Sequence, residues 1–131
     1  MLKRILLFTS YLLTSFVSLS QATLEDQKMF NAIDKVAKTP GVNPNFQKVV
    51  EYFFQQECDS TLKISNQVIS EHPGQEILNY SLFLRGRCLL SKKLYEESKK
   101  SFHQISNDFL LTNLVITSLG EIALEQKEFK K

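Results

Sequence analysis

Glycine, proline and tryptophan are scarce in this sequence: 131 residues include 4 Gly, 3 Pro and no Trp. Glycine and proline form the tight turns of all-β chains, so their scarcity excludes a fold of many short hairpins. The chain also lacks an excess of charge of either sign: it has 16 basic and 14 acidic residues and no basic run. Such a balance gives no sign of a nucleic-acid partner. Hydrophobic residues make up 43% of the chain, enough for the core of one domain.

The sequence motifs of common enzymes are absent too. His72 and His103 do not form an HExxH motif, and Cys58 and Cys88 do not form a CxxC motif. There is no glycine-rich loop that could hold a phosphate. We therefore expect a protein without catalytic residues, cofactor or metal.

The first 22 residues have the layout of a secretory signal peptide. Lys3 and Arg4 make a positive start, an apolar run follows, and Ser20 and Ala22 are small residues at the positions read for cleavage. The run contains several hydroxyl residues and is shorter than the ~20 residues of a membrane span. We expect cleavage after Ala22 and a secreted or periplasmic protein. The alternatives are an uncleaved N-terminal membrane anchor and a buried helix of the domain.

The rest of the chain has apolar residues at helical spacing, which predicts an all-α fold. Residues 75–91 are apolar on more than one face, so this helix should be buried between its neighbours. Asp59 is a candidate cap of the helix that follows it. Short links between helices favour an array of antiparallel helix pairs. The predicted helices span residues 23–38, 46–57, 59–72, 75–91, 94–106 and 110–126.

An internal repeat is the most informative feature of the sequence. The separation between Gly86 and Gly120 is the same as that between Leu90 and Leu124. Tyr95 and Phe129 are separated by this interval as well. The shared interval matches the period of the tetratricopeptide repeat, about 34 residues. After Tyr95, small and apolar residues follow at the spacing of one helix face: Ser98, Phe102 and Ile105.

The stretch ISEHPGQEILNYSLFLRGRCLLSKKLYEESKKSFHQI resembles a tetratricopeptide repeat at most of its marker positions. It is similar to repeats of bacterial periplasmic proteins, the Tol-Pal cell-division coordinator and outer-membrane assembly lipoprotein families. No Cys lies near the predicted cleavage site, which departs from the lipoprotein family. A weaker copy, without the glycine, ends at Pro73. The resemblance covers about residues 46–131 and implies a tetratricopeptide-like α-solenoid, with another α-hairpin fold as the alternative.

Three parts follow from this alignment. They are a signal peptide at residues 1–22, an N-terminal helix and linker at 23–45, and two to three repeats at 46–131. The last repeat is incomplete, because Phe129 falls where its second helix should start. Its lone helix either closes the array as a cap or is the end of a product shortened from a longer gene.

The resemblance implies a concave face that binds peptides or partner helices. The candidate function is an exported, non-enzymatic scaffold for a peptide or partner protein of the cell envelope. The alternatives are a small permanent subunit of an envelope complex and a remnant of a longer repeat protein. A membrane contact is expected only if the signal peptide is retained, and the oligomeric state stays open. Candidate partner-binding residues are Tyr80, Phe83, Arg87, Leu90, Thr117 and Glu121.

Two of these assignments have a simpler alternative. Phe83 could be a core residue of its own helix pair, and Arg87 and Glu121 could pair across neighbouring helices.

Cys58 and Cys88 are candidates for a disulfide bond. Cys58 would lie at the start of the second helix of one pair, and Cys88 late in the first helix of the next pair. Antiparallel packing places the start of one helix beside the end of its neighbour. The bond would close a loop of about 30 residues and contribute ~3–4 kcal/mol. The alternative is two buried thiols that behave as small apolar groups.

Overall fold

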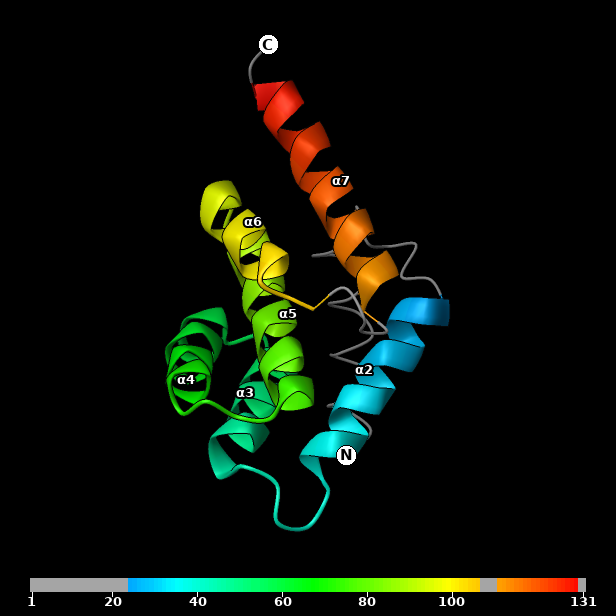
Figure 1. Cartoon of the computed structure of the whole chain (residues 1–131). Helices are drawn as coiled ribbons and strands as arrows, with labels where there is room; N and C mark the ends of the chain where they lie inside the picture. The colour runs from blue at the N-terminus through cyan, green and yellow to red at the C-terminus, as the bar shows by residue number, and fades with distance from the viewer. Residues whose placement is uncertain (1–23, 107–110, 130–131) are drawn as a thin grey trace.

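The structure, a computed structural model, describes residues 24–106 and 111–129, and these fold into helices without any strand (Figure 1). The all-α prediction is confirmed. The predicted signal peptide lies outside the described residues. The helices are α2 (Leu24–Ala37), α3 (Pro44–Phe54), α4 (Cys58–Ser70), α5 (Gln75–Ser91), α6 (Tyr95–His103) and α7 (Thr112–Phe129).

Helix α5 is the centre of the packing. It contacts α3, α4, α6 and α7, and almost every side chain from 79 to 90 is buried. Figure 1 shows α5 in the middle, with α4 and α2 at opposite edges of the molecule. The predicted burial of residues 75–91 between neighbouring helices is confirmed. From α3 onwards, each helix packs on the next one along the chain. In addition, α5 contacts both α3 and α7.

Helix α3 begins two residues earlier than the sequence predicted. The side chain of Asn43 caps it by accepting hydrogen bonds from the amides of Asn45 and Phe46. Pro44 is the first helical residue, a position where the backbone N–H has no partner within the helix, so the missing N–H of proline costs no hydrogen bond. Pro44 therefore starts a helix instead of belonging to the break before it.

The predicted cap at Asp59 is wrong. Helix α4 starts at Cys58 and its N-cap residue is Glu57, which makes no side-chain cap bond. Asp59 is already inside the first turn, and its carboxylate pairs with Lys92 at the end of α5.

The links α3–α4 and α5–α6 have the same geometry. Each contains one non-glycine residue in the left-handed region, Gln56 with φ of 65° and Lys93 with φ of 62°. In both links, the amide of the next residue returns to the carbonyl five residues earlier at 2.9 Å. This closure satisfies carbonyls that the helix end leaves unpaired. The link makes α3–α4 and α5–α6 two comparable helix pairs.

Close contact between α5 and α6 depends on a glycine. A Cβ placed on Gly86 would lie 2.6 Å from the ring of Phe102. The hydroxyl of Ser98 donates to the carbonyl of Gly86 at 2.7 Å, and that of Ser101 to the carbonyl of Leu82 at 2.8 Å. Small side chains on both helices thus let the two backbones approach, and the Phe102 ring fills the space left by the missing Cβ.

Candidate functional site

The residues predicted to line a concave face lie mostly in the interior. Tyr80, Phe83, Arg87 and Leu90 are buried on α5, and Phe83 is fully so. The ring of Tyr80 stacks on Phe46 of α3 with 6.4 Å between centroids. These four residues therefore form contacts within the chain. The two predicted residues of α7 are more accessible: Thr117 is exposed and Glu121 half-buried.

Arg87 joins three helices beneath the surface. Its Nη1 donates to the hydroxyl of Ser118 on α7 at 3.2 Å, and its guanidinium lies 5.7 Å from the ring centre of Phe83. Burial lowers the pKa of Arg87, while the carboxylates of Asp26 on α2 and Glu121 on α7 oppose that shift. The same burial raises the pKa of Glu121 despite the nearby guanidinium. The Arg87 guanidinium and the Glu121 carboxylate thus act on each other electrostatically across neighbouring helices.

Helix α2 covers part of the inner face, which sequence reasoning did not anticipate. Asp26 is buried and acts electrostatically on Arg87. The ring of Phe30 lies 5.7 Å from that of Phe53 and 6.1 Å from that of Phe54, both on α3. One signal could have revealed this: Asp26 shares the spacing of the buried apolar face of its own helix, which continues with Phe30, Ile33 and Ala37.

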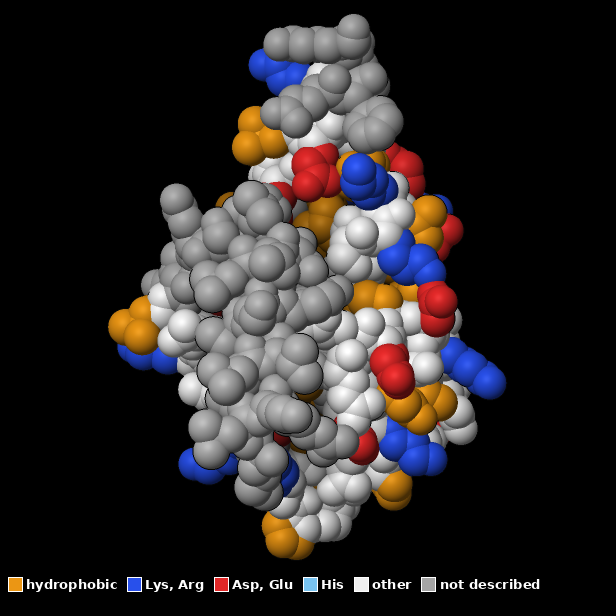
Figure 2. Space-filling view, turned by 180° about the vertical axis from the view of Figure 1, so that it is seen from behind, with side chains coloured by type: hydrophobic (Ala, Val, Ile, Leu, Met, Phe, Trp, Pro, Cys, Tyr) orange, Lys and Arg blue, Asp and Glu red, His pale blue; other side chains and the backbone are white. Residues whose placement is uncertain are grey.

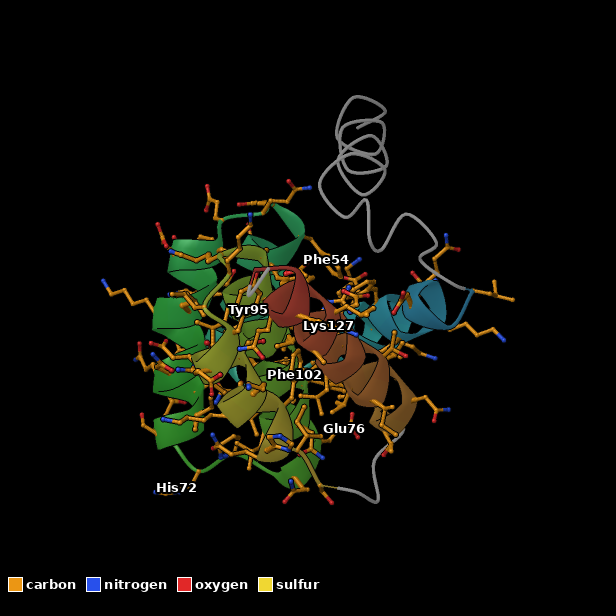
Figure 3. The ribbon with its side chains drawn as sticks, turned by 90° about the horizontal axis from the view of Figure 1, so that it is seen from above. Phe54, His72, Glu76, Tyr95, Phe102 and Lys127 are labelled. Carbon is orange, nitrogen blue, oxygen red and sulfur yellow. The ribbon has the colours of Figure 1, made fainter. Side chains whose placement is uncertain are left out.

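Helix α7 has an apolar face that no described residue covers. Ile116 is 61% exposed and Leu124 66% exposed, and nothing lies within 4 Å of a Cβ placed on Gly120. Ala123, also exposed, completes this surface, which we call the α7 open face. In Figure 3, α7 runs across the molecule beside α6, with Lys127 labelled on its last turns.

The same face of α5 is covered. The positions that correspond to the α7 open face one repeat earlier are all buried: Leu82, Gly86, Leu89 and Leu90. Helix α6 covers Gly86 through the ring of Phe102. The open face of α7 is therefore the surface on which, one repeat earlier, a second helix packs.

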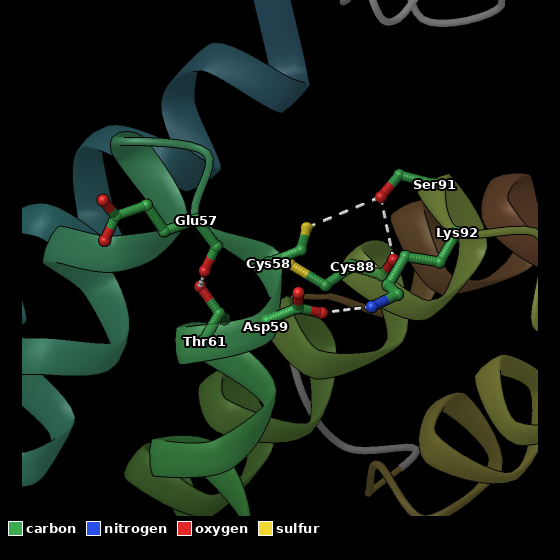
Figure 4. Close-up of polar contacts among 7 residues, drawn as sticks. All are labelled: Glu57, Cys58, Asp59, Thr61, Cys88, Ser91 and Lys92. Atoms are coloured by element: carbon green, nitrogen blue, oxygen red, sulfur yellow. Dashed lines mark hydrogen bonds and ion pairs between the residues drawn. The ribbon is translucent and has the colours of Figure 1, made fainter.

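Cys58 and Cys88 are brought together, as the antiparallel arrangement predicted. Both are free thiols in the structure, and Figure 4 shows their side chains next to each other. The Sγ of Cys58 also lies 3.5 Å from the Oγ of Ser91. The hydrogen bond from Cys88 lowers the pKa of Cys58 to about 6, against the effect of burial, and Lys92 adds to the lowering. The same hydrogen bond, followed by burial, raises the pKa of Cys88.

A shallow hollow of about 250 Å³ lies where α4, α5 and α6 meet. Most of the residues that line it are polar or charged, among them Arg85, Glu97 and Lys100. The Nε of Arg85 donates to Asn66 Oδ1 across it at 2.8 Å. Small-molecule sites are enclosed and mainly apolar, so this hollow lacks the character of one. Among the described side chains on the face seen in Figure 2, basic and acidic groups are interspersed without a large patch of either sign.

Among residues 24–106 and 111–129, no three His, Cys, Asp or Glu side chains form a group that could hold a metal ion. His72 and His103 are both exposed, and Figure 3 shows His72 at the edge of the molecule, far from Tyr95 and Lys127. None of the described helices is long and apolar enough to cross a bilayer.

No protein-family model, curated protein or solved structure matches this chain. Its function is therefore argued from the geometry of the chain itself.

Proposed function

We propose that this chain is an exported, non-enzymatic scaffold of tetratricopeptide-like helix pairs that binds a helix of a partner protein on the α7 open face. The observation that carries the proposal is the contrast between Gly86, covered by α6, and Gly120, which has open space around it. The two glycines are one repeat apart and sit in the same local pattern.

The packing order supports the repeat assignment. The pairs α3–α4 and α5–α6 share one link geometry, and α3, α5 and α7 contact one another in sequence. In an array of this kind each repeat buries the face that its neighbour leaves open. The first pair lacks the marker glycine. When the two links are aligned at Gln56 and Lys93, Val49 takes the place of Gly86 and Ser65 that of Phe102. The larger side chain thus lies on the first helix of this pair and the smaller one on the second.

Binding through α7 is favoured over capture of a peptide on the inner face. The predicted inner residues of α5 are buried, and α2 places Asp26 and Phe30 over that side. A peptide could reach them only if neighbouring helices moved away, because Tyr80 packs on Phe46 of α3 and Phe83 on Phe102 of α6. Ile116 and Leu124 need no such movement. The exposed apolar residues of α7 therefore favour α7 as the surface that binds the partner.

The partner surface is defined by the chemistry of the open face. Ile116 and Leu124 require apolar side chains one to two turns apart on a helix. Gly120 leaves room for a ring, as Gly86 does for Phe102. Lys127 is exposed at the C-terminal end of this face and favours an acidic group at the matching end of the partner. We expect an amphipathic helix with one aromatic residue and a terminal acidic group.

The test is a titration with a helical peptide of stated sequence. The probe is a cross-linked peptide with the sequence of residues 94–106, because this segment covers the equivalent face of α5 and short free helices are marginal in water. We expect saturable binding by fluorescence anisotropy, weakened at least about tenfold by Leu124→Glu. Leu24→Glu is the matched control, since Leu24 is 67% exposed on α2.

Binding that is absent, or weakened equally by Leu24→Glu, would contradict the proposal. Sedimentation of the chain alone tests a second copy as the occupant: a dimer abolished by Leu124→Glu would replace the partner helix with self-association. Export is tested separately by N-terminal sequencing of the protein recovered outside the cytoplasm, where we expect the first residue to be Thr23.

A further inference from the structure

Two thiols meet where the first helix pair packs on the second. Cys58 is the first residue of α4, and Cys88 lies in the last turns of α5 (Figure 4). Figure 4 shows the two side chains next to each other, and Ser91 joins them by bonding both the Cys58 sulfur and the Cys88 carbonyl. The helices that carry them, α4 and α5, pack on each other.

The surroundings of the two thiols differ. Cys58 is partly exposed and sits at the N-terminus of a 13-residue helix, where the helix dipole stabilises a thiolate. The hydroxyl of Ser91 lies within 3.5 Å of it, and the ammonium of Lys92 adds a favourable charge. Cys88 is only 1% exposed, so an external reagent cannot reach it directly.

We propose that Cys58 and Cys88 form a dithiol site for an external disulfide, with Cys58 as the attacking thiol and Cys88 as the resolving thiol. This site is independent of the α7 open face. The oxidant is a disulfide, either of a small molecule or of a thiol oxidoreductase. The product is a Cys58–Cys88 bond that joins α4 to α5.

The exchange proceeds in two balanced steps. The Cys58 thiolate attacks one sulfur of the external disulfide, whose S–S bond breaks, and the departing thiolate takes up a proton to leave as a thiol. Cys88 then attacks the Cys58 sulfur of this mixed disulfide, and its proton passes to the second departing thiolate. Two protein thiols are oxidised to one disulfide, and the external disulfide is reduced to two thiols.

The bond would stabilise the fold against heat. It closes a loop of about 30 residues, which restricts the unfolded chain. For a domain of this length we expect the melting temperature of the oxidised protein to exceed that of the reduced protein by roughly 10–20 °C. Reductant should reverse the increase.

Mass spectrometry with oxidised glutathione tests the two roles. The reduced chain without its signal peptide should lose both free thiols and two hydrogens in mass, and should stay monomeric. Cys88→Ser should accumulate one glutathione on Cys58, because no resolving thiol remains. Cys58→Ser should take up none, because Cys88 is shielded. A parallel reaction with an oxidised CxxC oxidoreductase compares the rates with the two kinds of external disulfide, and oxidation by at least one of them is required.

The roles can also be checked without relying on one variant. Cys88→Ala replaces Cys88→Ser if circular dichroism shows that the serine variant is unfolded. In the wild-type chain, alkylation of Cys58 should follow a titration curve centred near pH 6, at least about tenfold faster at pH 7 than alkylation of Cys88. A wild-type chain that keeps both thiols, forms disulfide-linked dimers, or is alkylated equally at both cysteines would overturn the proposal.

Discussion

Helix α5 and helix α7 carry the same pattern one repeat apart, but their surroundings differ. On α5, Gly86 lies so close to α6 that an added Cβ would stand 2.6 Å from Phe102. On α7, an added Cβ at Gly120 would meet nothing within 4 Å. An apolar pattern therefore defines the face of a helix that needs a cover, whereas the cover itself must come from another helix.

The largest effect is expected where the cover is removed from α5. Phe102→Ala deletes a buried ring that packs against both Gly86 and Phe83. We expect the free energy of unfolding to fall by about 3–5 kcal/mol, measured by urea denaturation. Leu124→Ala on the open face is the control, expected to change stability by no more than about 0.5 kcal/mol. Similar losses in both variants would show that α7 is also covered in solution.

A smaller loss should follow from filling the space at Gly86. Gly86→Ala places a methyl group against the Phe102 ring, and overpacking of this kind costs about 1–3 kcal/mol. Alanine regains up to about 1 kcal/mol through its higher helix propensity. We expect net destabilisation in denaturant melts, partly restored by the double variant Gly86→Ala with Phe102→Leu. Restoration by an unrelated core substitution would contradict the contact.

The same substitution should have the opposite sign at Gly120. Gly120→Ala adds a methyl group into open space within a helix, so only the propensity gain remains. We expect stabilisation by about 1 kcal/mol in the same melts. Destabilisation here would mean that a second helix already lies on the α7 open face. The sign of this one measurement decides between a covered and an uncovered face.

The smallest effect concerns the charges at equivalent positions, Arg87 on α5 and Glu121 on α7. Burial raises the pKa of Glu121 above its unfolded value, so its ionised form is disfavoured in the fold. Stability from this group is present at pH values below the unfolded pKa of about 4.3 and is lost as pH rises through the folded pKa. The free energy of unfolding of Glu121→Gln, relative to that of wild type, should therefore be higher at pH 8 than at pH 4, by less than about 1 kcal/mol. An equal difference at both pH values would contradict this.

Much of the helical framework could be predicted from sequence. The predicted bounds of α5, residues 75–91, agree with the structure, because apolar side chains run through that helix and Pro73-Gly74 precede it. The start of α4 was not predicted, because the preceding link uses Gln56 in the left-handed region instead of a glycine. Backbone hydrogen bonds close this link, and the N-cap residue Glu57 makes no side-chain cap bond. Asp59 therefore resembled a cap in sequence but lies within the helix.

The candidate site was harder to predict than the helices. Tyr80, Phe83, Arg87 and Leu90 do share one face of α5, as the repeat alignment implied. Their burial comes from other helices: Tyr80 stacks on Phe46 of α3, and Phe83 lies against Phe102 of α6. Arg87 reaches Ser118 of α7. Helical spacing within α5 contains no information about which distant helix packs on it. The meeting of Cys58 and Cys88 was predictable, since it needed only the antiparallel packing of adjacent helices.

Residue spacing along the chain was sufficient to define the helices, their apolar faces and the repeat correspondence between α5 and α7, because each of these is a local property. Which of the equivalent faces is buried depends on tertiary packing. Helix α6 covers Gly86, α2 and α7 bring Asp26 and Glu121 near Arg87, and the face around Gly120 stays open among the described residues. Burial is a property of two surfaces in contact, and a repeat pattern describes only one of them.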